Sequence, residues 1–120
     1  MALRTETRIS GDVIVLRCIG TLGIGEETEF RERVKKLLSE KHRIVLDLNE
    51  IGHIDSIGLS ALVGLFRWAS NEIRLVSSGG HLTNLLRRTK LDKVLTVYTS
   101  EQEAMASFSG TKALSAKPQA

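Results

Sequence analysis

The feature that most constrains this fold is the alternation of short apolar runs with segments of helical periodicity. After two β-prone runs at the N-terminus, helical segments and short apolar runs alternate from residue 26 to residue 108. Parallel strands need long crossover connections, usually helices, so this order predicts an α/β fold with a mostly parallel sheet. A chain of 120 residues is expected to form one domain.

The strands are predicted from runs of β-prone residues between turn signals. Two such runs surround a turn at Gly11 and Asp12 and predict a hairpin. The second run, residues 13–20, is apolar on both faces, so we expect it inside the sheet. The run 43–48 predicts a central parallel strand, and 73–78 and 93–98 predict two more. The segments 20–25 and 49–55 are expected to be loops.

Four helices are predicted from apolar spacing and end signals. In residues 26–42, Phe30, Val34, Leu37 and Leu38 follow the i, i+4, i+7, i+8 pattern of one helix face. Further helices are expected over 56–69, 79–90 and 100–108, the last with a capping box in which Ser100 pairs with Glu103. The prediction is one domain over residues 1–110, with an N-terminal hairpin strand and about four helices packed mainly on one face. Residues 111–120 are expected to form a flexible tail.

Composition argues against several classes of protein. The net charge is +3, but basic and acidic residues are interspersed and only 4% of residues are aromatic, so direct nucleic-acid binding is not expected. No apolar run reaches 18 residues and no secretory signal opens the chain, so we expect no membrane insertion and a cytoplasmic location. The single Cys18 lies in an apolar run and predicts a buried, inert thiol.

No constellation of residues predicts catalysis or a cofactor. His42, His53 and His81 lack the spacing of metal ligands, and neither glycine-rich phosphate motif occurs. Asp47 and Glu50 are expected to be solvated loop carboxylates. The neighbours His53, Asp55 and Ser56 have the residue types of a hydrolytic triad, but the nucleophile elbow is missing and so close a spacing prevents the geometry. We therefore expect a binding protein and not an enzyme.

Asp55 and Ser56 stand where a buried strand hands over to the second helix, in "HIDSIGLSAL". Either side chain is able to cap the helix, because Asp and Ser both accept hydrogen bonds from first-turn N–H groups. Gly58, just inside the helix, permits another backbone to approach closely.

The second helix carries more apolar residues than one buried face holds. Leu59, Val63 and Phe66 are not expected to share a face with Leu62, Leu65 and Trp68. The sequence leaves two interpretations open, namely a partner surface beside the helix start or a helix deep in the core.

The stretch "IVLDLNEIGHIDSIGLSAL" resembles the signature of STAS-domain proteins, the anti-sigma-factor antagonists. Their pattern is an apolar strand ending in L-D-L, a short loop, and D-S-x-G-L at a helix start. The resemblance extends over about residues 5–108 and implies the STAS fold. It also implies that a serine kinase, itself the anti-sigma factor, phosphorylates Ser56, and that a PP2C-type phosphatase reverses this. The unphosphorylated form would bind the anti-sigma factor and free the sigma factor for transcription.

The resemblance also directs attention to a docking surface for the kinase. We expect it at the helix start, on the exposed part of the second helix and on the loop before the first helix, with the chain a monomer or weak dimer. The residues expected to bind the partner are Asp55, Ser56, Ile57, Gly58, Leu59, Val63, Thr21, Leu22 and Gly23. Close family members often carry an acidic residue where this chain has Gly23. The alternative is a STAS interaction subunit of a stress-sensing assembly or a lipid transporter, without a kinase cycle.

Overall fold

The computed structural model describes the backbone of residues 3–40 and 42–115, and the side chains of residues 3–40 and 42–108. Its sheet has five strands in the order β1-β2-β3-β4-β5. Only β1 runs antiparallel to its neighbour, and the remaining pairs are parallel, as predicted. The elements in chain order are β1 (Leu3–Ser10), β2 (Val13–Leu22), α1 (Glu27–Ser39), β3 (Arg43–Ile54), α2 (Ser56–Ala69), β4 (Ile73–Val76), α3 (Gly80–Arg88), the 3-10 turn η1 (Leu91–Lys93), β5 (Val97–Tyr98) and α4 (Glu101–Ser115).

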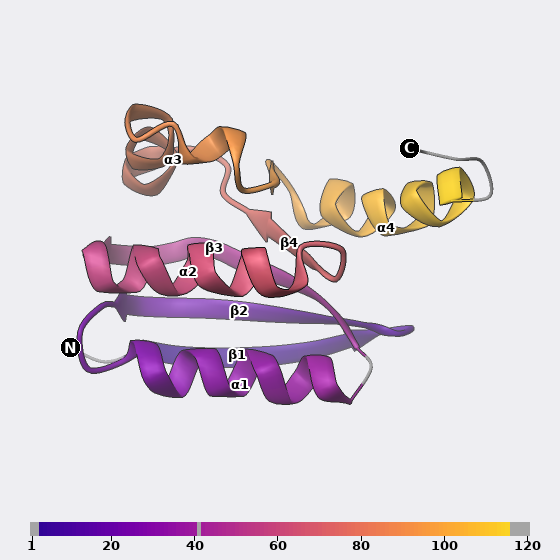
Figure 1. Cartoon of the computed structure of the whole chain (residues 1–120), viewed down its shortest axis with the longest axis horizontal. Coiled ribbons are helices and arrows are strands. Elements are labelled where there is room, and N and C mark those ends of the chain that lie inside the picture. The colour runs from indigo at the N-terminus through magenta and orange to yellow at the C-terminus, as the bar shows by residue number, and fades with distance from the viewer. Residues whose placement is uncertain (1–2, 41, 116–120) are drawn as a thin grey trace.

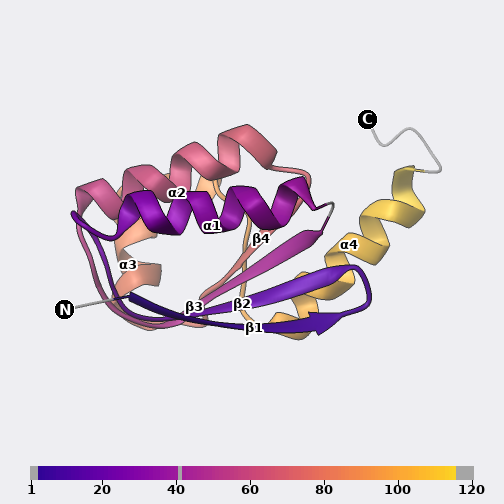
Figure 2. The ribbon, with the colours of Figure 1, turned by 90° about the horizontal axis from the view of Figure 1, so that it is seen from below.

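The helices cover the two faces of the sheet unequally (Figures 1 and 2). α1 and α2 lie side by side on one face, and leucines of α3 join the same core. α4 covers the opposite face alone and packs over a smaller apolar cluster of valines from β2, β3 and β4. The prediction of helices mainly on one face is therefore confirmed.

The interior strands separate the two cores by alternation. In β2, Val13 and Val15 face α4, whereas Leu16 and Cys18 face the larger core. Cys18 is buried, as predicted. Its burial raises the pKa of the thiol to about 12, which disfavours the reactive thiolate.

Several predicted strand boundaries were wrong. β2 continues to Leu22 and β3 to Ile54, although both ends were expected to be loops. These ends pair with each other, Thr21 with His53 and Leu22 with Ile54, across register irregularities that local sequence does not reveal. The last strand is only Val97–Tyr98, because residues 91–93 form a 3-10 turn instead.

α4 runs beyond the end predicted for it. The helix continues to Ser115, so the first part of the predicted tail is helical, while residues 116–120 lie outside the described residues. Ser100 Oγ accepts the N–H of Glu103 at 3.1 Å, which is one half of the predicted capping box. The Glu103 carboxylate instead accepts a hydrogen bond from Thr99 Oγ1.

Polar side chains hold α4 against the sheet. Arg74 of β4 is buried, donates to Ser107 Oγ at 2.7 Å and lies 4.3 Å from the centre of the Phe108 ring. Asp47 is also buried, which corrects the prediction of a solvated carboxylate. Its burial, together with a hydrogen bond shared with Glu101, raises the pKa of Asp47. Glu50 is exposed and pairs with Arg17 at 2.8 Å.

α2 has the predicted bounds, but its faces differ from the prediction. Leu62, Leu65 and Phe66 are buried together, while Leu59 and Val63 are only half-buried. Trp68, at 58% exposure, lies outside the core and stacks beneath the Lys35 ammonium. Phe66 therefore lies on the buried face with Leu62 and Leu65, where Trp68 was expected, and Trp68 lies outside the core.

This division of α2 predicts unequal costs for two large truncations. Leu62→Ala should lower the free energy of unfolding by about 2–5 kcal/mol, because it opens a cavity in the core. Trp68→Ala should cost less than about 1 kcal/mol, because the indole makes little more than an exposed cation–π contact. Urea denaturation measures both, and similar losses for the two variants would contradict the assignment of faces.

Candidate functional site

Asp55 is placed at the point where two parallel strands end together. Leu22 of β2 pairs with Ile54 of β3, and Asp55 follows directly as the N-cap of α2. The Asp55 N–H donates to the Leu22 carbonyl at 3.4 Å, and its carbonyl accepts the N–H of Leu59 at 2.9 Å. One residue therefore closes the sheet edge and opens the helix.

The Asp55 carboxylate joins the helix to the loop after β2. Its Oδ1 accepts the N–H of Gly58 at 2.9 Å, and its Oδ2 accepts the N–H of Ile24 at 2.9 Å. These backbone donors, Gly58 first, lower the pKa of Asp55 because they stabilise the ionised form. The loop that carries Ile24 is thereby fixed beside the first turn of α2.

Ser56 is the first residue of α2 and is exposed. Asp55 provides the side-chain cap, so the choice between the two residues that the sequence left open is settled. Among the described residues, no side chain or backbone group forms a hydrogen bond with the Ser56 hydroxyl. The hydroxyl has no structural role there and stays open to solvent.

Two glycines make this close packing possible. A Cβ at Gly58 would lie 2.1 Å from the carbonyl oxygen of Leu22, so α2 contacts the end of β2 through bare backbone. A Cβ at Gly23 would lie 2.6 Å from Asp55 Oδ2. An acidic side chain at position 23 would therefore meet the Asp55 carboxylate.

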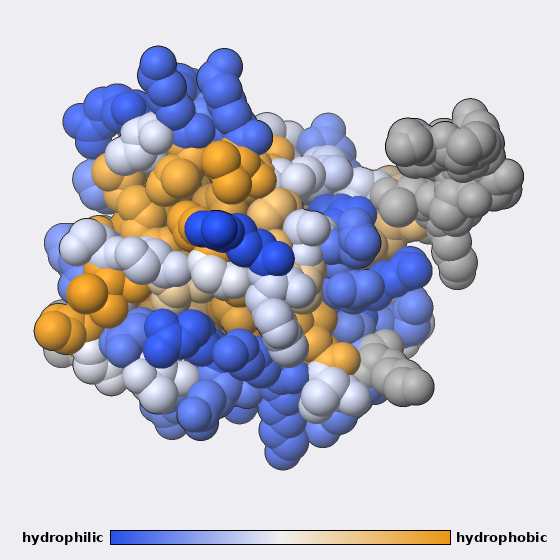
Figure 3. All heavy atoms as spheres, in the orientation of Figure 1, coloured by the Kyte–Doolittle hydropathy of each residue, from blue (hydrophilic) through white to orange (hydrophobic). Residues whose placement is uncertain are grey.

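An apolar surface surrounds Ser56. Ile24 is 74% exposed and Ile57 is 41% exposed, on the loop and the helix start respectively. Along α2 the surface continues as a groove of about 470 Å³ between α2 and η1. Figure 3 shows this apolar area over α2, crossed by one strongly hydrophilic side chain. The groove is lined by Ser56, Leu59, Ser60, Val63, Gly64, Arg67 and Leu91.

Some of the predicted site residues are exposed to a partner, and the others hold the exposed ones in place. Ser56, Ile57, Leu59 and Val63 lie at the surface or in the groove wall. The sequence pattern missed Arg67 and Leu91, because only the packing of η1 against α2 brings them together. The residues that hold the surface in place are the buried Leu22, Gly23 and Gly58, with Thr21 and Asp55 half-buried.

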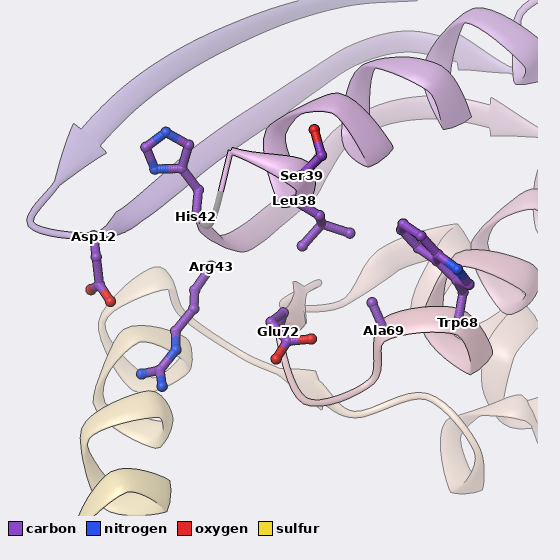
Figure 4. A pocket seen from close by; sticks show the side chains of 8 residues that line it. All are labelled: Asp12, Leu38, Ser39, His42, Arg43, Trp68, Ala69 and Glu72. Atoms are coloured by element: carbon purple, nitrogen blue, oxygen red, sulfur yellow. The ribbon is translucent and has the colours of Figure 1, made fainter.

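A larger hollow of about 720 Å³ lies at the other end of α2 (Figure 4). Its polar side chains do not converge on one point, since His42 and Arg43 point in opposite directions. The Arg43 guanidinium instead lies 5.5 Å from the centre of the Phe108 ring. This hollow therefore lacks the convergent polar groups of a small-molecule site.

The described residues contain no set of three His, Cys, Asp or Glu side chains placed to hold a metal ion. Nor do they contain a hydrogen bond between His53 and Ser56, which a hydrolytic triad requires. None of the helices in the described part of the chain is long and apolar enough to cross a bilayer.

The family model for the STAS domain matches residues 4–104, nearly the whole of the described fold. The chain belongs to the STAS domain family. The paired ends of β2 and β3 and the Asp55 cap lie well inside the matched range.

Solved structures show the same fold in other STAS-like proteins. A Thermotoga maritima protein assigned to the anti-sigma factor antagonists, TM1081, is 27% identical with a TM-score of 0.77, over 87% of this chain and 93% of that one. The phosphorylated form of the Bacillus cell fate determinant SpoIIAA is 17% identical with a TM-score of 0.61, over 88% and 97%. A sulfate transporter family protein from Wolinella succinogenes is 18% identical with a TM-score of 0.65, over 85% and 88%. The last two similarities concern the fold alone.

The glycines of α2 give this STAS domain a matched pair of tests. Gly58→Ala should lower the free energy of unfolding by about 1–3 kcal/mol, because its methyl group overlaps the Leu22 carbonyl. Gly64→Ala, whose Cβ would have no neighbour within 4 Å, should raise it by about 0.5–1 kcal/mol through better helix propensity. Thermal and urea denaturation distinguish them, and a neutral Gly58→Ala would show that α2 is free to shift.

The lowered pKa of Asp55 predicts a pH dependence of the cap. A carboxyl group with a depressed folded pKa stabilises the fold above its unfolded pKa, about 4, and loses this effect as pH falls through the folded value. Wild type should therefore melt at a higher temperature than Asp55→Asn near pH 7, and the gap should narrow below about pH 4. Melting temperatures measured across this range test the cap. A gap that stays constant with pH would show that ionisation of Asp55 is irrelevant.

Proposed function

We propose that this STAS domain is an anti-sigma-factor antagonist that phosphorylation of Ser56 switches off. Unphosphorylated, it binds an anti-sigma factor that is also a serine kinase, and so frees a sigma factor. A PP2C-type phosphatase restores the binding form. The domain acts by binding in the cytoplasm, without catalysis and without direct contact to nucleic acid.

The observation that carries the proposal is the free Ser56 hydroxyl. Because Asp55 performs the capping, Ser56 is left exposed at the helix start beside an apolar surface. A kinase therefore reaches the hydroxyl without unfolding the helix. The family membership and the similarity to TM1081 support the same function.

The position of Ser56 suits a switch that changes binding but not folding. A phosphate group adds roughly −1.5 to −2 charge at neutral pH. The N-terminus of a helix tolerates such charge, because its backbone N–H groups and dipole favour anions. A partner surface fitted to a neutral hydroxyl beside Asp55 would instead meet a bulky dianion, so the complex should break while the fold survives.

The direct test combines the domain with each anti-sigma-factor kinase encoded in the source genome. With ATP, mass spectrometry should locate phosphate on Ser56, and Ser56→Ala should abolish it. Ser70→Ala is the matched control, because Ser70 is exposed at the far end of α2, outside the groove, and its loss should leave phosphorylation intact. Phosphate on another residue in the presence of a bound kinase would refute the proposed site.

Two variants separate charge from capping. Ser56→Asp should weaken kinase binding at least tenfold while changing the free energy of unfolding by less than about 1 kcal/mol. Ser56→Ala should bind like wild type and lose less than about 0.5 kcal/mol, because Asp55 and not Ser56 caps the helix. Equal binding by both variants would reject the switch. Absence of phosphorylation together with capture of a transporter subunit would favour the alternative role of a STAS interaction subunit.

A further inference from the structure

The groove beside Ser56 carries chemistry that the phosphorylation switch does not use. Its walls are the half-buried Leu59 and Val63 of α2 and Leu91 of η1. Its one charged lining residue is Arg67, and no acidic side chain lines it. The groove thus combines an apolar floor with a single positive charge.

Arg67 has no carboxylate partner within the described residues. A second cation lies at the end of the same helix, where Lys35 Nζ is 5.2 Å from the centre of the exposed Trp68 ring. The one carboxylate at the opposite end, that of Asp55, already accepts two backbone N–H groups. The exposed side of α2 is therefore both apolar and locally positive.

The shape of the groove suits an elongated partner segment. A Cβ at Gly64 would meet nothing within 4 Å, so the groove floor is open in the middle of α2. Ser56, Ser60 and Gly64 follow each other at four-residue spacing along the groove side of α2. Small residues on such a row permit close approach of a second helix.

We infer that the groove between α2 and η1 docks an acidic amphipathic helix of the protein partner. Apolar side chains of that helix pack on Leu59, Val63 and Leu91, and a carboxylate pairs with Arg67. This inference rests on the proposed function in one respect, since it describes the partner of the same surface. It adds the partner's chemistry and extends the surface from Ser56 along α2 to Arg67.

A second copy of this chain fits the groove poorly. A symmetric dimer centred on the groove would place the same surface against itself, and so bring one Arg67 close to the other. Like charges opposed in an interface disfavour association. An acidic amphipathic helix is able to pack apolar side chains on the groove wall and to place a carboxylate beside Arg67.

The test uses synthetic peptides and needs no kinase. A helical peptide of leucine and glutamate in amphipathic order is titrated against the domain, with a leucine–lysine peptide and an acidic peptide of scrambled order as comparisons. Isothermal titration calorimetry measures the affinity of each peptide. The amphipathic acidic peptide should bind at least tenfold more tightly than either comparison peptide.

Charge reversal assigns the binding to Arg67. Arg67→Glu should weaken binding of the acidic peptide at least tenfold and should improve binding of the leucine–lysine peptide. Arg33→Glu makes the same change on the outer side of α1, beside Leu3 and Thr5, and should leave both affinities unchanged. Circular dichroism and melting temperature should show that both variants are folded, as expected for exposed arginines.

Several outcomes would overturn the inference. Equal binding of the acidic peptide by wild type and Arg67→Glu, preference for the basic peptide, or no binding of the amphipathic acidic peptide would each do so. The inference would also fall if the scrambled acidic peptide bound as tightly as the amphipathic one and lost its affinity steeply with added salt. That result would show unspecific charge attraction. Self-association that Leu59→Glu abolishes, measured by sedimentation, would assign the groove to a second copy.

The kinase experiment separates this inference from the proposed function. If a kinase binds and phosphorylates Ser56 but Arg67→Glu leaves its affinity unchanged, the function stands and the acidic-helix inference falls. If no kinase modifies Ser56 yet the peptides show the expected charge dependence, the inference stands and the phosphorylation switch falls.

Discussion

The Asp55 carboxylate is the interaction on which the functional end of this domain depends. It joins the first turn of α2 to the loop after β2, because one oxygen accepts the N–H of Gly58 and the other accepts the N–H of Ile24. Without it, the helix would have an uncapped start and the loop with Ile24 would lose its anchor. Because Asp55 caps the helix, the side chain of the neighbouring Ser56 is not needed for capping. Under the proposed function, the cap and the regulated hydroxyl thus belong to adjacent residues.

This separation explains how a charged modification is compatible with a well-packed fold. Gly58 holds α2 against the Leu22 carbonyl so closely that the helix has no room to move toward the sheet. A phosphate on Ser56 would therefore act at the surface, where binding is decided, and not through a rearranged core. Ile24 and Ile57 beside Ser56 are exposed in the unmodified protein. A phosphate on Ser56 would add charge beside them.

Sequence reasoning succeeded where local signals and the tertiary structure agree. The bounds of α2 follow from a capping residue and a continuous helical pattern, and the parallel sheet follows from the order of elements.

Sequence reasoning failed where contacts between distant parts of the chain determine the structure. The strand ends at Thr21 and His53 are polar or glycine-rich and become strands only through mutual pairing. Asp47 is buried because α4 covers it, and Trp68 is exposed because α1 offers Lys35 instead of a pocket. Arg67 and Leu91 meet only after η1 has packed on α2.

The attachment of α4 determines how the domain opens. This helix covers a cluster of four valines and is held by buried polar groups such as Arg74 and Asp47, whereas the other helices share one large leucine-rich core. Fewer apolar contacts mean a lower free energy of local opening. Detachment of α4 would expose one face of the interior strands while leaving the face beneath α1 and α2, and with it the Ser56 surface, still folded. The sheet thus separates the core beneath α1 and α2, which opens at a higher free energy, from the smaller cluster beneath α4, which opens at a lower one.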